Sequence, residues 1–338
     1  MQQDKGEVGI ARQRDTCFKK KRPVSYASVP DLDKEIDRLV AEGVTSAVDH
    51  SDWAAPIVAV RKNGKIRLCA DFSTGLNDAL QLHQHPLPTA EKVFTKLNGG
   101  QVFTQIDFAE AYLQVEVEKE SKDMLTINTH RGLFKHNRLH CGVKSAPGIF
   151  QQIMDAMICG LEGVAAYLDD VIVTGRTDAE HRKNLVALFK SIQEYGFHVR
   201  MEECNFLMPQ IRYLGRTIDK GGRHPDPEKN EVIRQMFLPK NVQEVRSFLG
   251  MVSYYGSFVA EMRRWTKECE AAFKRAKEVL ASDLLLTHFD PSLRIIVAAD
   301  ASDYGIGALM TDHNRCCTSS DRRRWCQSMQ QIVSNDGN

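Results

Sequence analysis

In Val164-Ala165-Ala166-Tyr167-Leu168-Asp169-Asp170-Val171-Ile172-Val173, two adjacent carboxylates stand between two apolar, strand-forming runs. This pattern predicts a hairpin of two buried strands with the acids at or beside its tip. Because a buried carboxylate without a partner is costly, a pair at this place favours a bound cation, and Mg²⁺ prefers such oxygen ligands. The alternative is that Asp169 and Asp170 are ordinary turn residues, since Asp is common in turns.

A second acid ends another predicted strand. Residues 102–108 are predicted to form a strand that ends in an acid, Asp107. Two strand-end acids in one sheet can point at the same spot, so we group Asp107 with Asp169 and Asp170 as a candidate site for two Mg²⁺ ions, for which Mn²⁺ can substitute. Two such ions support phosphoryl and nucleotidyl transfer. The acids alone leave a polymerase and a two-metal nuclease both open.

A basic hairpin is predicted where residues 56–60 and 66–70 flank Asn63-Gly64, because Asn-Gly is a preferred tight turn between strands. It gathers four basic side chains, Arg61, Lys62, Lys65 and Arg67. One interpretation is a cationic flap that clamps a triphosphate, which favours a polymerase. The alternative is a solvated edge hairpin whose lysines discourage aggregation.

The remaining periodicity predicts an α+β layer with an antiparallel sheet. Helices are expected at 31–42, 145–158 and 178–195, strands at 113–118, 197–200 and 211–218, and a hairpin of 124–128 with 133–139. The polar, His- and Pro-rich residues 71–96 predict an extended connector. After Gly222 the pattern turns helical, at 227–237, 241–259 and 266–280, before a last strand hairpin that starts at Ile295.

Composition indicates a globular, intracellular protein. The 338 residues carry a formal net charge of +1, so bulk charge does not announce a nucleic-acid partner. The nine cysteines include no CxxC pair, which argues for reduced thiols. No apolar run has the length of a membrane span, and the amino terminus has no signal-peptide core, so we expect a cytoplasmic protein without a membrane partner.

Several short motifs follow one another along the chain: Ser51-Asp52-Trp53-Ala54-Ala55-Pro56, Arg67-Leu68-Cys69-Ala70-Asp71-Phe72, Leu87-Pro88, Gln105-Ile106-Asp107, Ser145-Ala146-Pro147-Gly148-Ile149-Phe150-Gln151, Tyr167-Leu168-Asp169-Asp170, Tyr213-Leu214-Gly215, Arg246-Ser247-Phe248-Leu249-Gly250 and Ala299-Asp300-Ala301-Ser302. In this order they resemble the Pol region of gypsy-type LTR retrotransposons, that is, a reverse transcriptase followed by the start of an RNase H. The resemblance implies an RNA-directed DNA polymerase that adds deoxynucleoside triphosphates to a primer on an RNA or DNA template.

The resemblance also implies a right-hand polymerase fold. Its parts would be a basic leader or linker at 1–22, fingers and palm at 23–222, a reduced thumb at 223–262, a connection remnant at 263–293, an RNase H first-hairpin stub at 294–310, and a polar, disordered tail at 311–338.

Site residues can be carried over one at a time. Asp107, Asp169 and Asp170 would be the catalytic, metal-binding acids of the palm, with the carbonyl of Phe108 beside them. Tyr112 would lie under the sugar of the incoming nucleotide and discriminate against a 2′-hydroxyl. Its other interpretation is an aromatic residue packed on the sheet, and both can hold.

Further positions follow from the same resemblance. Arg67, with Lys62 or Arg61, would grip the triphosphate. Gln151 would sit on the helix under the template strand, and Tyr213-Leu214-Gly215 would form the primer grip. Asp300 matches the first RNase H carboxylate.

The chain departs from the family at three places. A helical segment that the family carries between Glu261-Met262-Arg263 and Trp265-Thr266-Lys267-Glu268-Cys269 is missing, which shortens the region that holds the duplex. His140-Cys141-Gly142 stands where the family usually has Pro-Phe-Gly, beside the nucleotide pocket. The remaining RNase H acids are absent, so no RNase H activity is expected. Two alternatives to an active polymerase are a degenerate element copy without activity and a nucleic-acid-binding protein that has kept the groove but not the chemistry.

Overall fold

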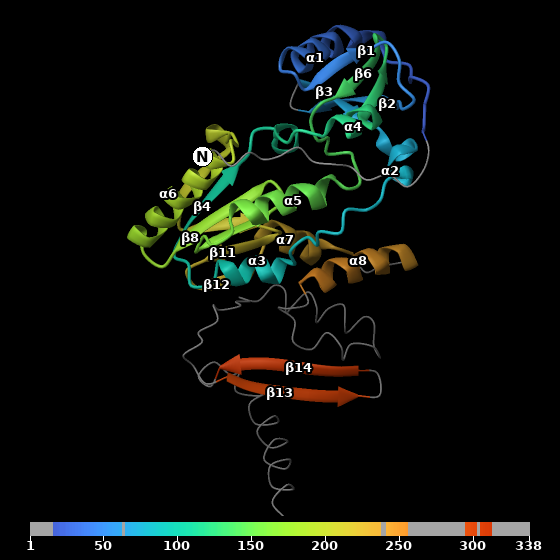
Figure 1. Cartoon of the computed structure of the whole chain (residues 1–338). Coiled ribbons are helices and arrows are strands. Elements are labelled where there is room, and N and C mark those ends of the chain that lie inside the picture. The colour runs from blue at the N-terminus through green and yellow to red at the C-terminus, as the bar shows by residue number, and fades with distance from the viewer. Residues whose placement is uncertain (1–15, 63–64, 238–240, 256–294, 303–304, 313–338) are drawn as a thin grey trace, which may run out of the picture. The chain divides into compact units, whose positions relative to one another are not determined.

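The computed structural model describes residues 16–62, 65–237, 241–255, 295–302 and 305–312 (Figure 1). The chain divides into two compact units, Met1–Thr287 and His288–Asn338. The first unit carries nearly all of the described elements. Its short helices and 3₁₀ turns are η1 Tyr26–Ser28, η2 Phe72–Thr74, α2 Leu76–Ala79, η3 Ala111–Gln114, α4 Lys119–Lys122, η4 Asp123–Leu125 and η5 Met201–Glu203.

A five-stranded sheet in the order β1-β6-β5-β2-β3 forms one end of the first unit. Its strands are β1 Thr45–Val48, β2 Ala55–Lys62, β3 Lys65–Ala70, β5 Thr126–Thr129 and β6 Gly132–His136. Helix α1 (Val29–Ala41) buries Leu32, Ile36 and Leu39, the apolar face that its sequence predicts. Strands β2 and β3 pair with Lys62 opposite Lys65, which confirms the hairpin predicted around Asn63-Gly64.

A four-stranded sheet in the order β7-β8-β4-β9 holds the acids predicted to meet. Its strands are β4 Val102–Asp107, β7 Val164–Tyr167, β8 Asp170–Gly175 and β9 Asn205–Met208. Alternate residues of β8 enter two different cores. Val171 and Val173 join the core that includes residues of α5 (Ala146–Met157) and α6 (Asp178–Glu194), whereas Ile172 joins the core of α3 (Ala90–Lys96) and a second, smaller sheet.

That smaller sheet is the antiparallel ribbon β10-β11-β12, formed by Gln210–Tyr213, Arg216–Asp219 and Gly222–Pro225. It lies on the side of the four-stranded sheet that carries Asp170, since Ile172 shares that side and contacts its core. Helices α7 (Pro227–Gln235) and α8 (Val242–Tyr254) follow it.

Four local predictions were wrong. Residues 197–200 form no strand, since Val199 makes only an isolated bridge to Phe108. The alternating residues 113–118 form no strand: η3 ends at Gln114, and the buried Val115 and Val117 flank a single bridge between Glu116 and Arg138. Residues 211–218 form two strands and a turn. The stretch 71–96 contains η2, α2 and α3, the last capped by the hydroxyl of Thr89. At 113–118 and 211–218 the apolar pattern was right about burial, but burial alone does not determine the partner of a strand.

The second unit is described only as a hairpin. Strand β13 (Ile295–Ser302) pairs antiparallel with β14 (Gly305–Asp312), from Ser302 opposite Gly305 to Ile295 opposite Asp312. The predicted connection remnant at 263–293, the tail beyond residue 312 and the end of the thumb after residue 255 lie outside the described residues. Among the helices that are described, none is both long and apolar enough to cross a membrane.

Candidate active site

The double-Asp stretch is a tight hairpin. Tyr167 ends β7 and pairs with Asp170 at the start of β8, so Leu168 and Asp169 are the two residues of the loop. The sequence prediction of acids at the tip is confirmed. Leu168 has φ 55°, a conformation that is unfavourable for a bulky L-residue and persists only where its surroundings hold it.

The register of β4 against β8 brings two of the acids together. Asp107 lies directly opposite Asp170, and residues opposite each other in an antiparallel pair share one face. The Nε2 group of Gln105 donates a hydrogen bond to Asp170 Oδ1 at 3.3 Å. The third acid, Asp169, stands in the loop next to this pair.

Burial and like charges act on these carboxyls. Burial raises the pKa of Asp107, the charges of Glu203 and Asp169 raise it further, and Arg200 opposes them. Burial also raises the pKa of Asp170, to which Asp169 and Asp107 add against the hydrogen bond from Gln105. The three acids are therefore close enough to repel one another.

A divalent cation fits this group by donor chemistry. Carboxylate oxygens are hard ligands that suit Mg²⁺ or Mn²⁺, and a cation would relieve the repulsion between Asp107, Asp169 and Asp170. As they stand, however, the described residues contain no group of three or more His, Cys, Asp or Glu side chains close enough to hold a metal ion.

The end of β4 is held by the segment that precedes β9. The backbone N–H of Arg200 donates to the carbonyl of Asp107 at 2.9 Å, and the N–H of Asp107 donates to Cys204 Sγ at 3.4 Å. Phe108 bridges to Val199 and packs its buried ring on Phe197 at 5.4 Å between centroids. Packing of Phe108 thus fixes the backbone beside Asp107.

Tyr112 packs as an aromatic residue against the core, which is one of its two interpretations, and its role under the sugar of the nucleotide stays a prediction. It lies on η3, and its ring packs on Phe150 with centroids 4.7 Å apart. Burial raises the pKa of Tyr112 to about 12, and the charge of Asp169 adds to this, so the half-buried ring also lies near the acids.

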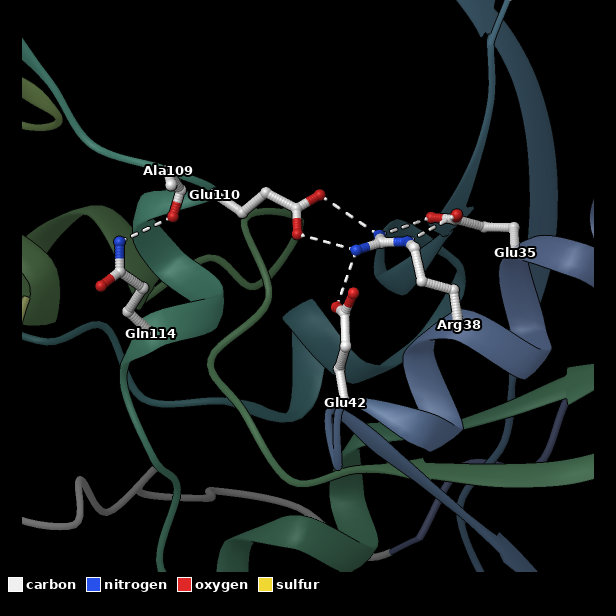
Figure 2. A network of polar contacts seen from close by, with 6 residues as sticks. All are labelled: Glu35, Arg38, Glu42, Ala109, Glu110 and Gln114. Carbon is white, nitrogen blue, oxygen red and sulfur yellow. Dashed lines mark hydrogen bonds and ion pairs between the residues drawn. The ribbon is translucent and has the colours of Figure 1, made fainter. Parts of the chain in front are cut away.

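The turn that carries Tyr112 is held by side-chain hydrogen bonds at both of its ends, Glu110 and Gln114 (Figure 2). Glu110, at φ 45°, accepts hydrogen bonds at 3.2 Å from both terminal nitrogens of Arg38 on α1. Gln114 donates to the carbonyls of Ala109 at 2.6 Å and His198 at 2.9 Å. Arg38 could not be identified from the sequence, because its spacing from Glu35 and Glu42 indicates only an exposed helix surface.

The residues predicted to grip the triphosphate lie in different surroundings, and their role stays a prediction. Arg67 is exposed on β3, and its charge lowers the pKa values of Cys69 and Cys141 against the raising effect of burial. The charge of Asp169 raises the pKa of Cys141, so the thiol lies near both Arg67 and Asp169. Arg61 instead pairs with Asp31 of α1 at 3.0 Å, and the side chain of Lys62 lies outside the described part.

The unusual His140-Cys141-Gly142 loop packs through its histidine. The ring of His140 meets Phe72 edge-on at 5.3 Å, and its Nδ1 accepts the Gly142 N–H at 3.0 Å. Burial lowers the pKa of His140 to about 4. A Cβ on Gly142 would lie 3.2 Å from the carbonyl of Ala70, so the loop runs close along the end of β3.

Gln151 is fully buried and bonded to the double-Asp hairpin. Its Oε1 accepts the N–H of Leu168 at 2.7 Å, while Nε2 donates to the carbonyl of Ala166 at 3.3 Å and to Asp155 Oδ1 at 2.9 Å. Asp155 in turn pairs with His85 at 2.8 Å. The contact of Gln151 with a template strand, which the resemblance implied, stays a prediction. What the structure shows is that Gln151 holds the strained turn at Leu168 by hydrogen bonds.

Tyr213-Leu214-Gly215 forms the tip of a second tight hairpin. Leu214 and Gly215, at φ 44° and 64°, connect β10 to β11 as the two positive-φ residues that such turns require. The hydroxyl of Tyr213 donates to the carbonyl of Asp170 at 3.3 Å. The predicted primer grip is therefore hydrogen-bonded directly to β8, the strand that begins with Asp170.

Asp300 belongs to the second unit and is described by its backbone. It lies on β13 opposite Gly307 of β14. Its predicted role as an RNase H carboxylate stays a prediction.

Comparison with known families assigns both parts of the chain. Residues 12–218, more than half of the chain, match the family described as reverse transcriptase (RNA-dependent DNA polymerase). Residues 265–319 match an RNase H-like domain found in reverse transcriptase, which begins within the segment predicted as a connection remnant and continues past residue 310.

Individual relatives agree with this. The chain is 45% identical over 254 residues to the uncharacterized protein K02A2.6 of Caenorhabditis elegans, which covers 74% of this chain and 20% of that protein. It is 28% identical over 315 residues to the retrovirus-related Pol polyprotein from transposon 412 of Drosophila melanogaster, covering 86% and 25%. The Tf2-3 transposon polyprotein of Schizosaccharomyces pombe is 27% identical over 311 residues, covering 86% and 23%. The chain thus spans a quarter or less of the length of these relatives.

The fold is also known from solved structures. The foamy viral protease-reverse transcriptase in complex with double-stranded DNA superposes with a TM-score of 0.75 at 19% identity, covering 97% of this chain and 77% of the other. A related complex with an RNA/DNA hybrid gives 0.73 at 19% identity, covering 97% and 49%. These likenesses confirm the expected fold class, and with the match over residues 12–218 they establish that the chain belongs to the reverse transcriptase family.

Proposed function

We propose that this chain is an RNA-directed DNA polymerase that adds deoxynucleotides to the 3′-hydroxyl of a primer, as part of the Pol protein of a gypsy-type LTR retrotransposon. The observation that carries the proposal is the register of β4 and β8, which sets Asp107 opposite Asp170 with Asp169 in the adjoining turn. Membership of the reverse transcriptase family selects polymerisation over the nuclease alternative.

The acids would bind two Mg²⁺ ions, or Mn²⁺, with the carbonyl of Phe108 beside them. Such ions supply Lewis-acid activation of a hydroxyl and neutralise the charge on a leaving pyrophosphate. The burial of Asp107 and Asp170 and the repulsion that raises their pKa values make this group a strong attractant for cations.

The other residues would orient the substrates. Arg67, with Lys62, would attract the triphosphate of the incoming nucleotide. Tyr112, packed on Phe150 and near Asp169, would offer its ring to the sugar and leave no room for a 2′-hydroxyl. Tyr213-Leu214-Gly215, bonded to Asp170, would position the primer terminus.

Nucleic acid would be held along the fingers and palm at 23–222 and the thumb at 223–262. The solved neighbours carry double-stranded DNA or an RNA/DNA hybrid, which supports a template and primer as partners. Because Lys and Arg contacts to phosphates release counterions, binding of a primer–template should weaken steeply as salt rises.

Extension of an oligo(dT) primer on a poly(A) template with Mg²⁺ or Mn²⁺ tests the proposal. Wild-type protein should extend the primer, and Asp169→Asn and Asp170→Asn should each reduce the rate by at least about a hundredfold. Asp37→Asn, an exposed acid on α1, is the matched control and should keep full activity.

Other outcomes identify the alternatives. Primer–template binding without extension would indicate a nucleic-acid-binding protein, and neither binding nor extension would indicate a degenerate copy. Extension that survives Asp169→Asn would overturn the assignment of the site.

We do not expect this chain to cleave RNA in an RNA/DNA hybrid. Asp300 is the one acid of the sequence that we could match to an RNase H centre, and a two-metal nuclease needs several. Release of labelled RNA fragments from a hybrid, lost in Asp300→Asn, would show that expectation to be wrong.

A further inference from the structure

The turn Leu214-Gly215 is bound from outside by two adjacent tyrosines at the end of α8. The hydroxyl of Tyr254 donates to the carbonyl of Leu214, and that of Tyr255 donates to the carbonyl of Gly215 at 2.9 Å. The two rings are perpendicular, with centroids 5.1 Å apart. The backbone carbonyls of both turn residues thus accept hydrogen bonds from side chains 40 residues further along the chain.

The fit between tyrosine and turn depends on Gly215. A Cβ built at this position would lie 3.1 Å from the Tyr254 hydroxyl and 2.9 Å from Lys229 Nζ. Glycine also accepts the positive φ of 64° without strain. The close approach of α8 and of the cationic Lys229 is therefore built into the sequence of the turn.

The same hairpin is fixed on its other sides. Tyr213 is buried and its hydroxyl donates to the carbonyl of Asp170 at 3.3 Å. Arg216, paired opposite Tyr213, is buried over Phe94 at 4.8 Å and bonds Glu91 at 2.9 Å. A continuous set of hydrogen bonds thus leads from α8 through residues 213–215 to the strand that begins with Asp170.

We infer that Tyr254 and Tyr255 are positioning residues for the primer terminus. By holding the carbonyls of Leu214 and Gly215, they set the height and angle of the 213–215 turn relative to Asp170. The cationic Lys229 beside Gly215 suits a phosphate of the primer strand. The inference rests on the proposed function, since it is the primer 3′-hydroxyl that must be placed against the acids.

Removal of the two hydroxyls tests this inference. Tyr254→Phe and Tyr255→Phe keep the rings and delete only the hydrogen bonds. Each should raise the KM for primer–template about five- to tenfold, as expected for one lost hydrogen bond, and leave the KM for the nucleotide unchanged. Tyr26→Phe is the matched control, because Tyr26 is 96% exposed.

A second measurement separates positioning from catalysis. A primer with 2-aminopurine as its 3′-terminal base reports the stacking of that base by fluorescence when the duplex binds, whether or not the chain polymerises. Wild type and Tyr26→Phe should give one emission intensity, and Tyr255→Phe should give a different one at saturating protein.

A double-mutant cycle completes the test. Tyr213→Phe and Tyr255→Phe act on the same turn, so their effects on primer affinity should be non-additive, whereas Tyr26→Phe should add independently. Unchanged 2-aminopurine emission and unchanged primer KM in both single variants would overturn the inference. Failure of the wild-type chain to extend would overturn the proposed function, and the emission of the bound terminus would still decide the role of the tyrosines.

Discussion

At the scale of single residues, the buried amide of Gln151 joins helix α5 to the strained turn of the acids. Leu168 holds a φ of 55°, and its N–H donates to Gln151 Oε1 at 2.7 Å. A bulky residue in this region stays there only if its surroundings over-determine it. The three hydrogen bonds of Gln151 provide that constraint, so the geometry of Asp169 depends on this fully buried side chain.

Gln151→Leu should therefore destabilise the protein and slow primer extension. The substitution keeps the volume but leaves the Leu168 N–H and the Ala166 carbonyl without this partner, at a cost of about 1–3 kcal/mol each. Chemical denaturation and the extension rate measure the two effects. Gln152→Leu, on the exposed face of the same helix, is the control. If both variants lose the same stability and the same extension rate, Gln151 does not stabilise the turn in the way described.

Buried histidines predict acid sensitivity. Burial lowers the pKa of His136 well below 6.5 and that of His140 to about 4, and the charges of the two rings, 5.0 Å apart, oppose each other. Both are thus neutral in the folded state, while an unfolded chain protonates them near pH 6.5. Stability should be full above about pH 6.5 and decline as the pH falls toward 4.

Unfolding by urea at several pH values checks this. His136→Leu should flatten the decline of stability with falling pH, because leucine takes up no proton. The substitution breaks no side-chain hydrogen bond, since neither ring nitrogen of His136 has a partner among the described residues. His50→Leu replaces an exposed histidine and should keep the wild-type slope. A variant as acid-sensitive as wild type would contradict the role of His136.

At the scale of elements, helix α1 is tied to the turn between β4 and η3. The guanidinium of Arg38 binds Glu110 at 3.2 Å as well as Glu35 and Glu42 of its own helix (Figure 2). Gln114 anchors the other end of the turn to His198. The Tyr112 ring is thereby held between two elements rather than by its own short 3₁₀ helix.

Arg38→Ala should loosen this turn more than it unfolds the protein. The side chains are partly exposed, so the loss of stability should stay near 0.5–1 kcal/mol, at about the value of a surface ion pair. The preference for deoxy- over ribonucleotides should fall, because Tyr112 sits on the released turn. Arg234→Ala, which breaks another i,i+3 pair, should leave that preference intact. If Arg38→Ala keeps the wild-type preference for deoxyribonucleotides, the Arg38–Glu110 contact does not position Tyr112.

At the scale of the whole molecule, the first unit has hydrophobic cores of its own among the residues that the structure describes. The residues of both hydrophobic clusters lie between Cys17 and Ile218, and α8 adds the tyrosines that cap the 214–215 turn. A unit with its own core can fold by itself.

A chain that ends at Thr287 should therefore keep a cooperative unfolding transition, with a change in unfolding free energy of less than about 1 kcal/mol. Circular dichroism on denaturation measures this. A chain that ends at Phe237 lacks α8 and is the comparison. It should have a lower free energy of unfolding, because the turn between β10 and β11 loses its hydrogen bonds from Tyr254 and Tyr255. A non-cooperative transition in the chain that ends at Thr287 would show that the second unit is part of the same folding unit.

The sequence by itself determined the short-range features of this protein. Val164–Val173 was correctly predicted as a hairpin with acids at its tip, and Asn63-Gly64 as the turn of another, because turn chemistry and alternation act over a few residues. The helices α1, α5 and α6 followed from their apolar faces in the same way. Errors arose at 113–118, 197–200 and 211–218, where apolar residues lack the expected strand partner. A further error arose at 71–96, where short helices form in a stretch that is polar overall.

Only the tertiary structure decided how these pieces meet at the site. The pairing of Asp107 with Asp170, the bond from Arg38 to Glu110 and the bond from Tyr255 to Gly215 join residues far apart in the chain. No local period encodes such contacts, because the packing of whole elements sets the register and reach of each side chain. The acids could thus be named from the sequence, and the residues that hold them in place could not.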